Sequence, residues 1–119
     1  MFLHGREVGF KLTIGAAAKV AALCPDGDLN RISELFAGGY AKTIDALAAF
    51  IAAMSDGYEQ ARRFEEPGYR PQPLTADEVL CLSPDELGEV QAAAMAAFTG
   101  DQKPKIEIEP EKKTEAAAD

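Results

Sequence analysis

The stretch Tyr40–Phe64 constrains the fold more than any other part of the sequence, because it contains no proline and only one glycine. Two glycines at 38–39 precede it, and a segment with three prolines, 65–74, follows it. Gly57 is the single interruption, where we expect the helix to bend or end. The pattern predicts one long central helix whose apolar side carries Ile44, Leu47, Ala48, Ile51 and Met54.

The N-terminal residues have the alternation of apolar and polar side chains that is typical of half-buried strands. They predict two short strands, Phe2–His4 and Glu7–Leu12, joined by a turn at Gly5-Arg6. A two-stranded hairpin is marginally stable in water. It is therefore expected to pack on a helix or to gain a further strand.

Capping signals predict two short helices near the N-terminus. Thr13 is the expected N-cap of a helix over 14–24, which the following proline ends. Asp28 is the expected N-cap of a second helix over 29–37, which stops at the two glycines. Both helices therefore have a polar residue at the start and a residue that breaks helices at the end.

Two capping-box patterns, at 75–78 and at 83–86, predict two further helices near the C-terminus. The first of these helices begins at Ala76. The second is expected to run over 84–99 and to end at Gly100. These two start signals are the most specific boundaries in the sequence.

The predicted fold class is mainly α: a compact bundle of four to five helices with a short N-terminal β-hairpin. With 119 residues the chain suits one domain, which we place at 1–100, followed by a flexible acidic and lysine-rich tail at 101–119. Within this tail, isoleucines alternate with charges over 105–109. A third strand at that place is the alternative to disorder.

The formal net charge of −8 argues against binding to nucleic acid and to anionic membranes. The sequence shows no apolar run long enough to span a bilayer and no secretory signal pattern. A cytoplasmic location is therefore expected. Cys24 and Cys81 fit no disulfide framework, so we expect two reduced cysteines buried like small hydrophobic residues.

Residue types that could support catalysis or bind a metal are sparse. His4 is the only histidine, so any catalytic triad would have to use a residue at a hairpin turn. Asp26 and Asp28 lack the glutamate that a calcium loop requires. No phosphate-binding loop is present. We therefore predict no enzymatic activity and no catalytic, metal-binding or cofactor-binding residues.

Both ends of the chain resemble a known family. The segments "FLHGREVGFKLTIGAAAKVAALCP" and "SPDELGEVQAAAMAAFTGD" are similar to the small tail assembly chaperones of long-tailed bacteriophages and prophages. The middle of the chain shares only its helical character with that family. The resemblance implies a non-enzymatic protein in the bacterial host cell that binds the tape-measure protein and keeps it soluble during tail assembly.

Alanine-rich faces on the predicted helices are candidate surfaces for such a partner. They lie at 48–53 and 92–97, and an aromatic and basic surface is expected near 58–62. The candidate partner-binding residues are Ala48, Ala52, Tyr58, Arg62, Ala93 and Ala97. The alternatives are that the alanine faces pack on each other and that the basic pair 62–63 lies on a solvated helix face.

Two other functions remain open from the sequence. One is a small adaptor or regulatory module that binds proteins, and the other is a structural tail-completion or connector protein of the virion. A homo-oligomer is also compatible with the sequence.

Overall fold

The structure is a computed structural model that describes residues 1–102. It is mainly α-helical with a short N-terminal hairpin, as predicted. The elements are β1 (Phe2–Leu3), β2 (Arg6–Glu7), α1 (Ile14–Leu23), two 3₁₀ turns (Pro25–Gly27 and Leu29–Arg31), α2 (Ile32–Leu35), α3 (Tyr40–Glu65), α4 (Ala76–Leu80) and α5 (Pro84–Gln102). The expected tail, except for its first two residues, and the alternative strand over 105–109 lie outside the described residues.

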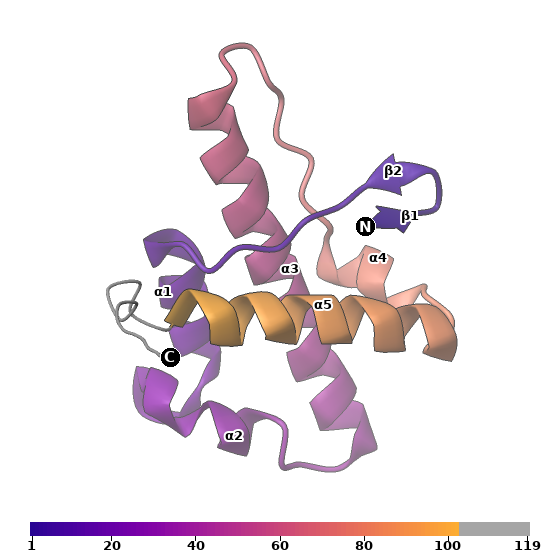
Figure 1. Cartoon of the computed structure of the whole chain (residues 1–119). Helices are drawn as coiled ribbons and strands as arrows, with labels where there is room; N and C mark the ends of the chain where they lie inside the picture. The colour runs from indigo at the N-terminus through magenta and orange to yellow at the C-terminus, as the bar shows by residue number, and fades with distance from the viewer. Residues whose placement is uncertain (103–119) are drawn as a thin grey trace, which may run out of the picture.

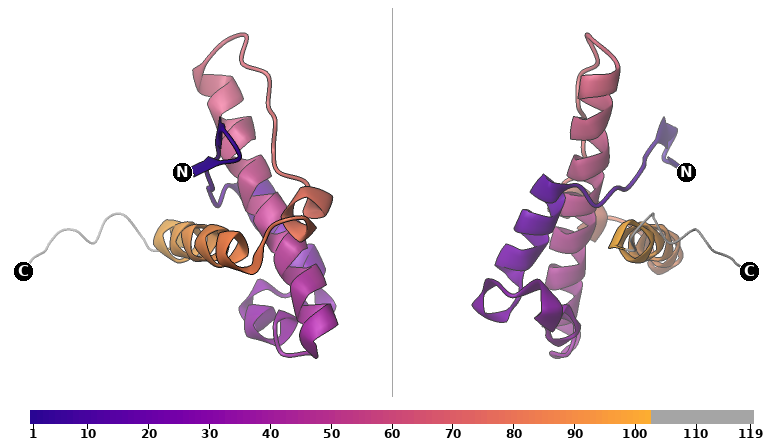
Figure 2. Two further views of the ribbon diagram at one scale, coloured as in Figure 1. Left: turned by 90° about the vertical axis from the view of Figure 1, so that its right-hand side faces the viewer. Right: turned by 60° about the vertical axis from the view of Figure 1, so that its left-hand side comes forward.

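The long helix α3 is the axis of the fold, and the other elements pack around it (Figure 1). Figure 2 shows α1 and α5 on different sides of α3, with α5 crossing α3 rather than running beside it. Phe50 of α3 is fully buried and makes edge-to-face ring contacts with Phe36 and Phe98, at centroid distances of 5.9 and 5.5 Å. The core therefore joins α2, α3 and α5 through aromatic rings.

The helix α3 continues through Gly57, so the expected bend or end at this residue is wrong. The structure gives a different reason for glycine here. A β-carbon at Gly57 would lie 2.3 Å from the carbonyl oxygen of Lys11 and 2.9 Å from the β-carbon of Ala16. The glycine lets the segment that leads into α1 cross the α3 backbone, where the amide of Lys11 donates to the carbonyl oxygen of Met54 at 3.1 Å.

The hairpin is confirmed, but its second strand is much shorter than predicted. The strands pair Phe2 with Glu7 and Leu3 with Arg6, so β2 ends at Glu7 and not at Leu12. Val8 still makes two backbone hydrogen bonds with Met1, and the chain then leaves the hairpin and crosses α3. The turn consists of His4 and Gly5, with φ angles of 50° and 82°, which places it one residue earlier than predicted.

The predicted N-caps are confirmed. The Thr13 side chain accepts from the amide of Ala16 at 3.0 Å, and the Asp28 carboxylate accepts from the amide of Asn30 at 3.0 Å. The boxes at 75–78 and 83–86 each have both reciprocal hydrogen bonds. At all four predicted helix starts, a side chain therefore accepts a hydrogen bond from a free backbone amide of the first turn.

Two predicted helix extents differ from the structure. The helix expected over 29–37 is a 3₁₀ turn followed by the short α2, because Arg31 has a φ of −100° and a ψ of 22°. The last helix continues through Gly100 to Gln102. A glycine inside a helix costs only about 1 kcal/mol, and a β-carbon at Gly100 would meet no atom within 4 Å. Nothing local therefore ends the helix there.

The two cysteines are free, and only one of them is buried. Cys24 is buried as expected, and burial, with a smaller contribution from Asp28, raises the pKa of its thiol. Cys81 is exposed, so the expectation that it is buried is wrong. The reason is that α4 ends at Leu80, which places Cys81 in the turn before α5.

Candidate protein-binding groove

The six candidate residues from the sequence do not form one surface. Ala48 is 1% exposed and lies in the core, so a partner cannot contact it in this structure. Ala52 lines a hollow between α1 and α3, beside Leu23. Ala93 and Ala97 are half-buried on α5, and Ala97 packs against the core. For Ala48 and Ala97, helix packing explains the alanine.

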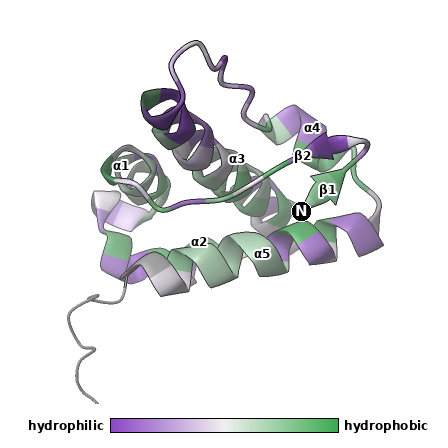
Figure 3. Cartoon of the chain, turned by 45° about the horizontal axis from the view of Figure 1, so that its top comes forward, coloured by the Kyte–Doolittle hydropathy of each residue, from purple (hydrophilic) through white to green (hydrophobic). Residues whose placement is uncertain are grey.

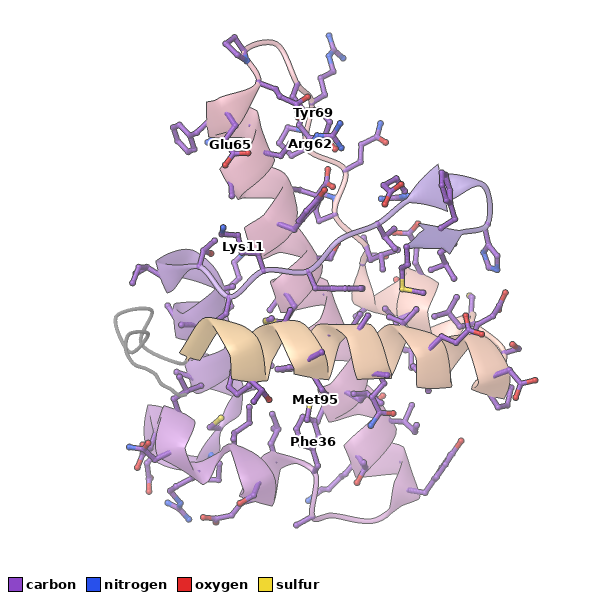
Figure 4. All side chains as sticks on the ribbon, viewed as in Figure 1. Lys11, Phe36, Arg62, Glu65, Tyr69 and Met95 are labelled. Atoms are coloured by element: carbon purple, nitrogen blue, oxygen red, sulfur yellow. The ribbon has the colours of Figure 1, made fainter. Side chains whose placement is uncertain are left out.

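Tyr58 and Arg62 do lie together, in a hollow of about 390 Å³ that Lys11 and Glu65 also line. The Arg62 guanidinium donates to the Glu66 carboxylate at 2.8 Å, and this bond is the largest cause of the raised pKa of Arg62. It also stacks over the ring of Tyr69, 4.3 Å from the centroid, as the side-chain view in Figure 4 shows. Arg62 is therefore engaged within the chain, and the hollow has charges of both signs.

A more apolar groove lies where the start of α3, the end of α4 and the start of α5 meet. We call it the α3–α4–α5 groove. Its volume is about 280 Å³, and its lining residues are Tyr40, Ile44, Val79, Leu80, Leu82, Pro84, Leu87, Gly88 and Gln91. Tyr40 is 84% exposed and Leu80 is 48% exposed. Grouped apolar side chains of this kind mark protein-binding surfaces.

The groove arises because three helix ends converge there. Tyr40 is the first residue of α3, Leu80 is the last residue of α4, and Pro84 is the first residue of α5. With only five residues, α4 buries Val79 in the core and leaves Leu80 at the surface. The apolar residues at the helix ends therefore line a groove instead of completing the core.

A second hollow of about 270 Å³ adjoins this groove and shares Gln91 with it. Phe36 and Met95 line it together with Thr43 and Leu47. Figure 4 shows Phe36 and Met95 close together beneath α5. The two hollows provide a largely apolar path along α5, on either side of Gln91.

The hairpin braces the two helices that form one wall of the groove. The imidazole Nε2 of His4 lies 2.7 Å from the Glu86 carboxylate of α5. The Arg6 guanidinium lies 3.5 Å from the Glu78 carboxylate of α4 and also donates to the carbonyl oxygen of Gln72. Sequence reasoning placed His4 correctly in an exposed turn, but no sequence signal indicated a partner 82 positions away.

Glu86 gives this brace a dependence on pH. The bond from the Ser83 amide and then the one to His4 lower the pKa of Glu86 below its ordinary value. A carboxyl with a lowered pKa in the folded state stabilises the fold above its unfolded-state pKa of about 4.3, and this contribution is lost as the pH falls through the folded-state value. We therefore expect the stability advantage of the native chain over Glu86→Gln to shrink between about pH 6 and pH 3.

Urea unfolding followed by circular dichroism at several pH values would measure this advantage. Glu89→Gln is the matched control, because it removes one negative charge from the same helix at a carboxylate that has no partner in the described part of the chain. A gap between the native chain and Glu86→Gln that stays constant from about pH 6 to pH 3 would contradict the assignment.

In the range 1–102, no group of three or more potential metal ligands occurs. None of the helices within it has both the length and the apolar character needed to cross a membrane. The α3–α4–α5 groove is the candidate site because the exposed apolar side chains of Tyr40 and Leu80 meet there.

The groove residues were not predicted as a site from the sequence. Ile44 was expected on the core stripe of the long helix, and neither Tyr40 nor Leu80 was assigned a role. The signal that could have found them is the apolar run 80–82 directly after a helix start with a capping box. Such a run leaves apolar side chains at a helix end.

Comparisons with protein-family models, with curated proteins and with solved structures found no match. The sequence patterns and the groove itself therefore carry the functional inference.

Proposed function

We propose that this protein is a non-enzymatic tail assembly chaperone of a long-tailed phage or prophage. In this role it binds the tape-measure protein and keeps it soluble while the tail is assembled in the cytoplasm of the bacterial host. The observation that carries the proposal is the apolar α3–α4–α5 groove in a chain with a net charge of −8. The groove lining contains no carboxylate, histidine or thiol, which favours binding over catalysis.

The groove suits the chemistry of such a client. An amphipathic helix binds in an apolar groove through side chains spaced three or four residues apart. Tyr40 and Leu80 are exposed without a client and would be covered by its apolar face. The negative charge of the chain then keeps the complex in solution. The sequence resemblance at both ends of the chain supports the same client.

The test is co-expression of the full chain with the tape-measure protein encoded beside it, followed by affinity pull-down. We expect a soluble complex with the native chain and a much weaker one with Leu80→Ser. Phe64→Ser is the matched control, because Phe64 is 80% exposed near the far end of α3. A tape-measure protein that is soluble alone and does not bind would contradict the proposal and favour an adaptor that binds another protein.

A further inference from the structure

Three carboxylates near the groove have no partner within the described residues. The side chains of Asp77, Asp85 and Glu89 are exposed and make no hydrogen bond or ion pair there. Asp85 lies one helical turn before Gly88 of the groove lining, and Glu89 follows Gly88 directly. Asp77 lies one turn before Leu80 and also lines the neighbouring hollow between α4 and the hairpin.

The other two carboxylates of this region are already engaged. The hairpin pairs Glu78 with Arg6 and Glu86 with His4. Residues 75–102 contain no lysine or arginine, so none of the remaining carboxylates is paired with a cation from α4 or α5. Lys42 of α3 extends its side chain over Gly38, where a β-carbon would lie 3.2 Å from the Lys42 stem. Figure 3 shows hydrophilic residues on α4 and at the start of α5.

We propose that the α3–α4–α5 groove selects an amphipathic helix whose apolar face is bordered by lysine or arginine residues. Cations at these positions meet Asp77, Asp85 and Glu89, whereas an acidic border meets three like charges. Gly88 and the exposed Ala92 lie on the same side of α5 and let a helix backbone approach closely. The inference rests on the proposed function, because it names the chemistry of the client segment.

The position of the carboxylates fixes how they act. They lie at the rim and remain hydrated, so they contribute mainly to the association rate and to specificity. Their effect must weaken with salt, because the Debye length falls from about 14 Å at 50 mM to about 4 Å at 500 mM. The apolar contacts do not weaken in this way, which separates the two contributions.

The test uses two synthetic helical peptides with the same apolar stripe, one bordered by lysines and the other by glutamates. Their binding to the full chain is measured by fluorescence anisotropy. We expect the basic peptide to bind about tenfold more tightly at low salt, and the difference to shrink at high salt. Leu80→Ser and Tyr40→Ser should each weaken binding of the basic peptide.

Charge variants of the chain test whether the carboxylates beside the groove cause the preference for the basic peptide. Glu89→Lys should reduce the preference for the basic peptide about threefold or more, without placing a cation in the first turn of a helix. Glu65→Lys makes the same charge change near the far end of α3 and should leave the preference unchanged. Equal effects of the two variants would overturn the proposal, because the preference would then reflect only the overall charge.

Three other results would also overturn it. The first is equal affinity for both peptides at low salt. The second is self-association of the free chain that Leu80→Ser abolishes, which would make a second copy the occupant. The third is tighter binding of both peptides after Ile106→Ser and Ile108→Ser, which would make the chain's own C-terminal segment the occupant. If the chain binds the basic peptide more tightly but does not capture the tape-measure protein, the charge preference of the groove stands. Only the proposed chaperone function is then contradicted.

Discussion

Replacing Gly57 with alanine is expected to lower the free energy of unfolding by about 3 kcal/mol, although alanine is the better helix former. The added β-carbon would lie 2.3 Å from the carbonyl oxygen of Lys11 and 2.9 Å from the β-carbon of Ala16. The first contact is with backbone, which cannot rotate away as a flexible side chain can. Relief therefore requires the segment before α1 to move off α3, and this breaks the hydrogen bond from Lys11 to Met54.

Gly88→Ala is the matched control for this prediction. It makes the same change inside a helix, but a β-carbon at Gly88 would meet no atom within 4 Å. At this position only the higher helix propensity of alanine over glycine acts, so the free energy of unfolding should rise by about 0.5–1 kcal/mol. Chemical denaturation followed by circular dichroism measures both variants. A rise in stability for both would mean that the chain does not cross α3 closely at Gly57.

The parts of the fold that the sequence predicted depend on local chemistry. Thr13 and the two capping boxes act on amides three residues away, so their effects can be read from neighbouring residues. The long helix was predicted nearly to its ends for a similar reason, because its apolar residues recur at helical spacing over many turns.

The parts that the sequence did not predict depend on contacts between distant segments. A glycine in a helical pattern can mark either a break or a close approach, and only the position of Lys11 distinguishes the two at Gly57. The pairing of His4 with Glu86 is equally distant. The predicted end of the second strand was wrong because the chain leaves the hairpin after Val8 and bonds to α3, where Lys11 donates to Met54.

The candidate site was harder to predict than the fold. Helical spacing shows which residues share a face, but it does not show whether another element covers that face. Ala48 and Leu80 both looked like ordinary helix residues, yet Ala48 is buried and Leu80 is 48% exposed. The difference arises because α4 ends after five residues, whereas the middle of α3 is covered by the elements that pack on it.

Glu59 leads to the second large prediction, because it is only 3% exposed on α3 and holds the loop 66–75. Its carboxylate accepts from the backbone amide of Gln72 at 2.9 Å and from the hydroxyl of Tyr69. The bond to Glu59 is also the largest cause of the raised pKa of Tyr69. One turn earlier, Ser55 accepts from the amide of Leu74 at 2.8 Å. Two buried polar side chains therefore fasten the loop to the helix.

We expect Glu59→Met to lower the free energy of unfolding by about 3 kcal/mol, because at nearly constant volume it removes the acceptor of both hydrogen bonds and leaves the half-buried Tyr69 hydroxyl and the Gln72 amide without it. Glu59→Gln keeps a carbonyl acceptor and should cost about 1 kcal/mol. Glu65→Met on the exposed part of the same helix is the control and should change stability by less than about 0.5 kcal/mol. Chemical denaturation gives these values, and hydrogen exchange at the Gln72 amide reports the loop directly.

The result for Glu59→Met decides between two opposing effects. Burying a carboxylate carries a desolvation cost, and replacing it with an apolar residue removes that cost. The variant could be as stable as the native chain, with the Gln72 amide still protected from hydrogen exchange. The desolvation cost would then equal the free energy of the two hydrogen bonds, and packing would hold the loop. A large loss would show that the hydrogen bonds dominate. In that case the loop also fixes the position of α4 and of Leu80, so the groove depends on a residue outside its own lining.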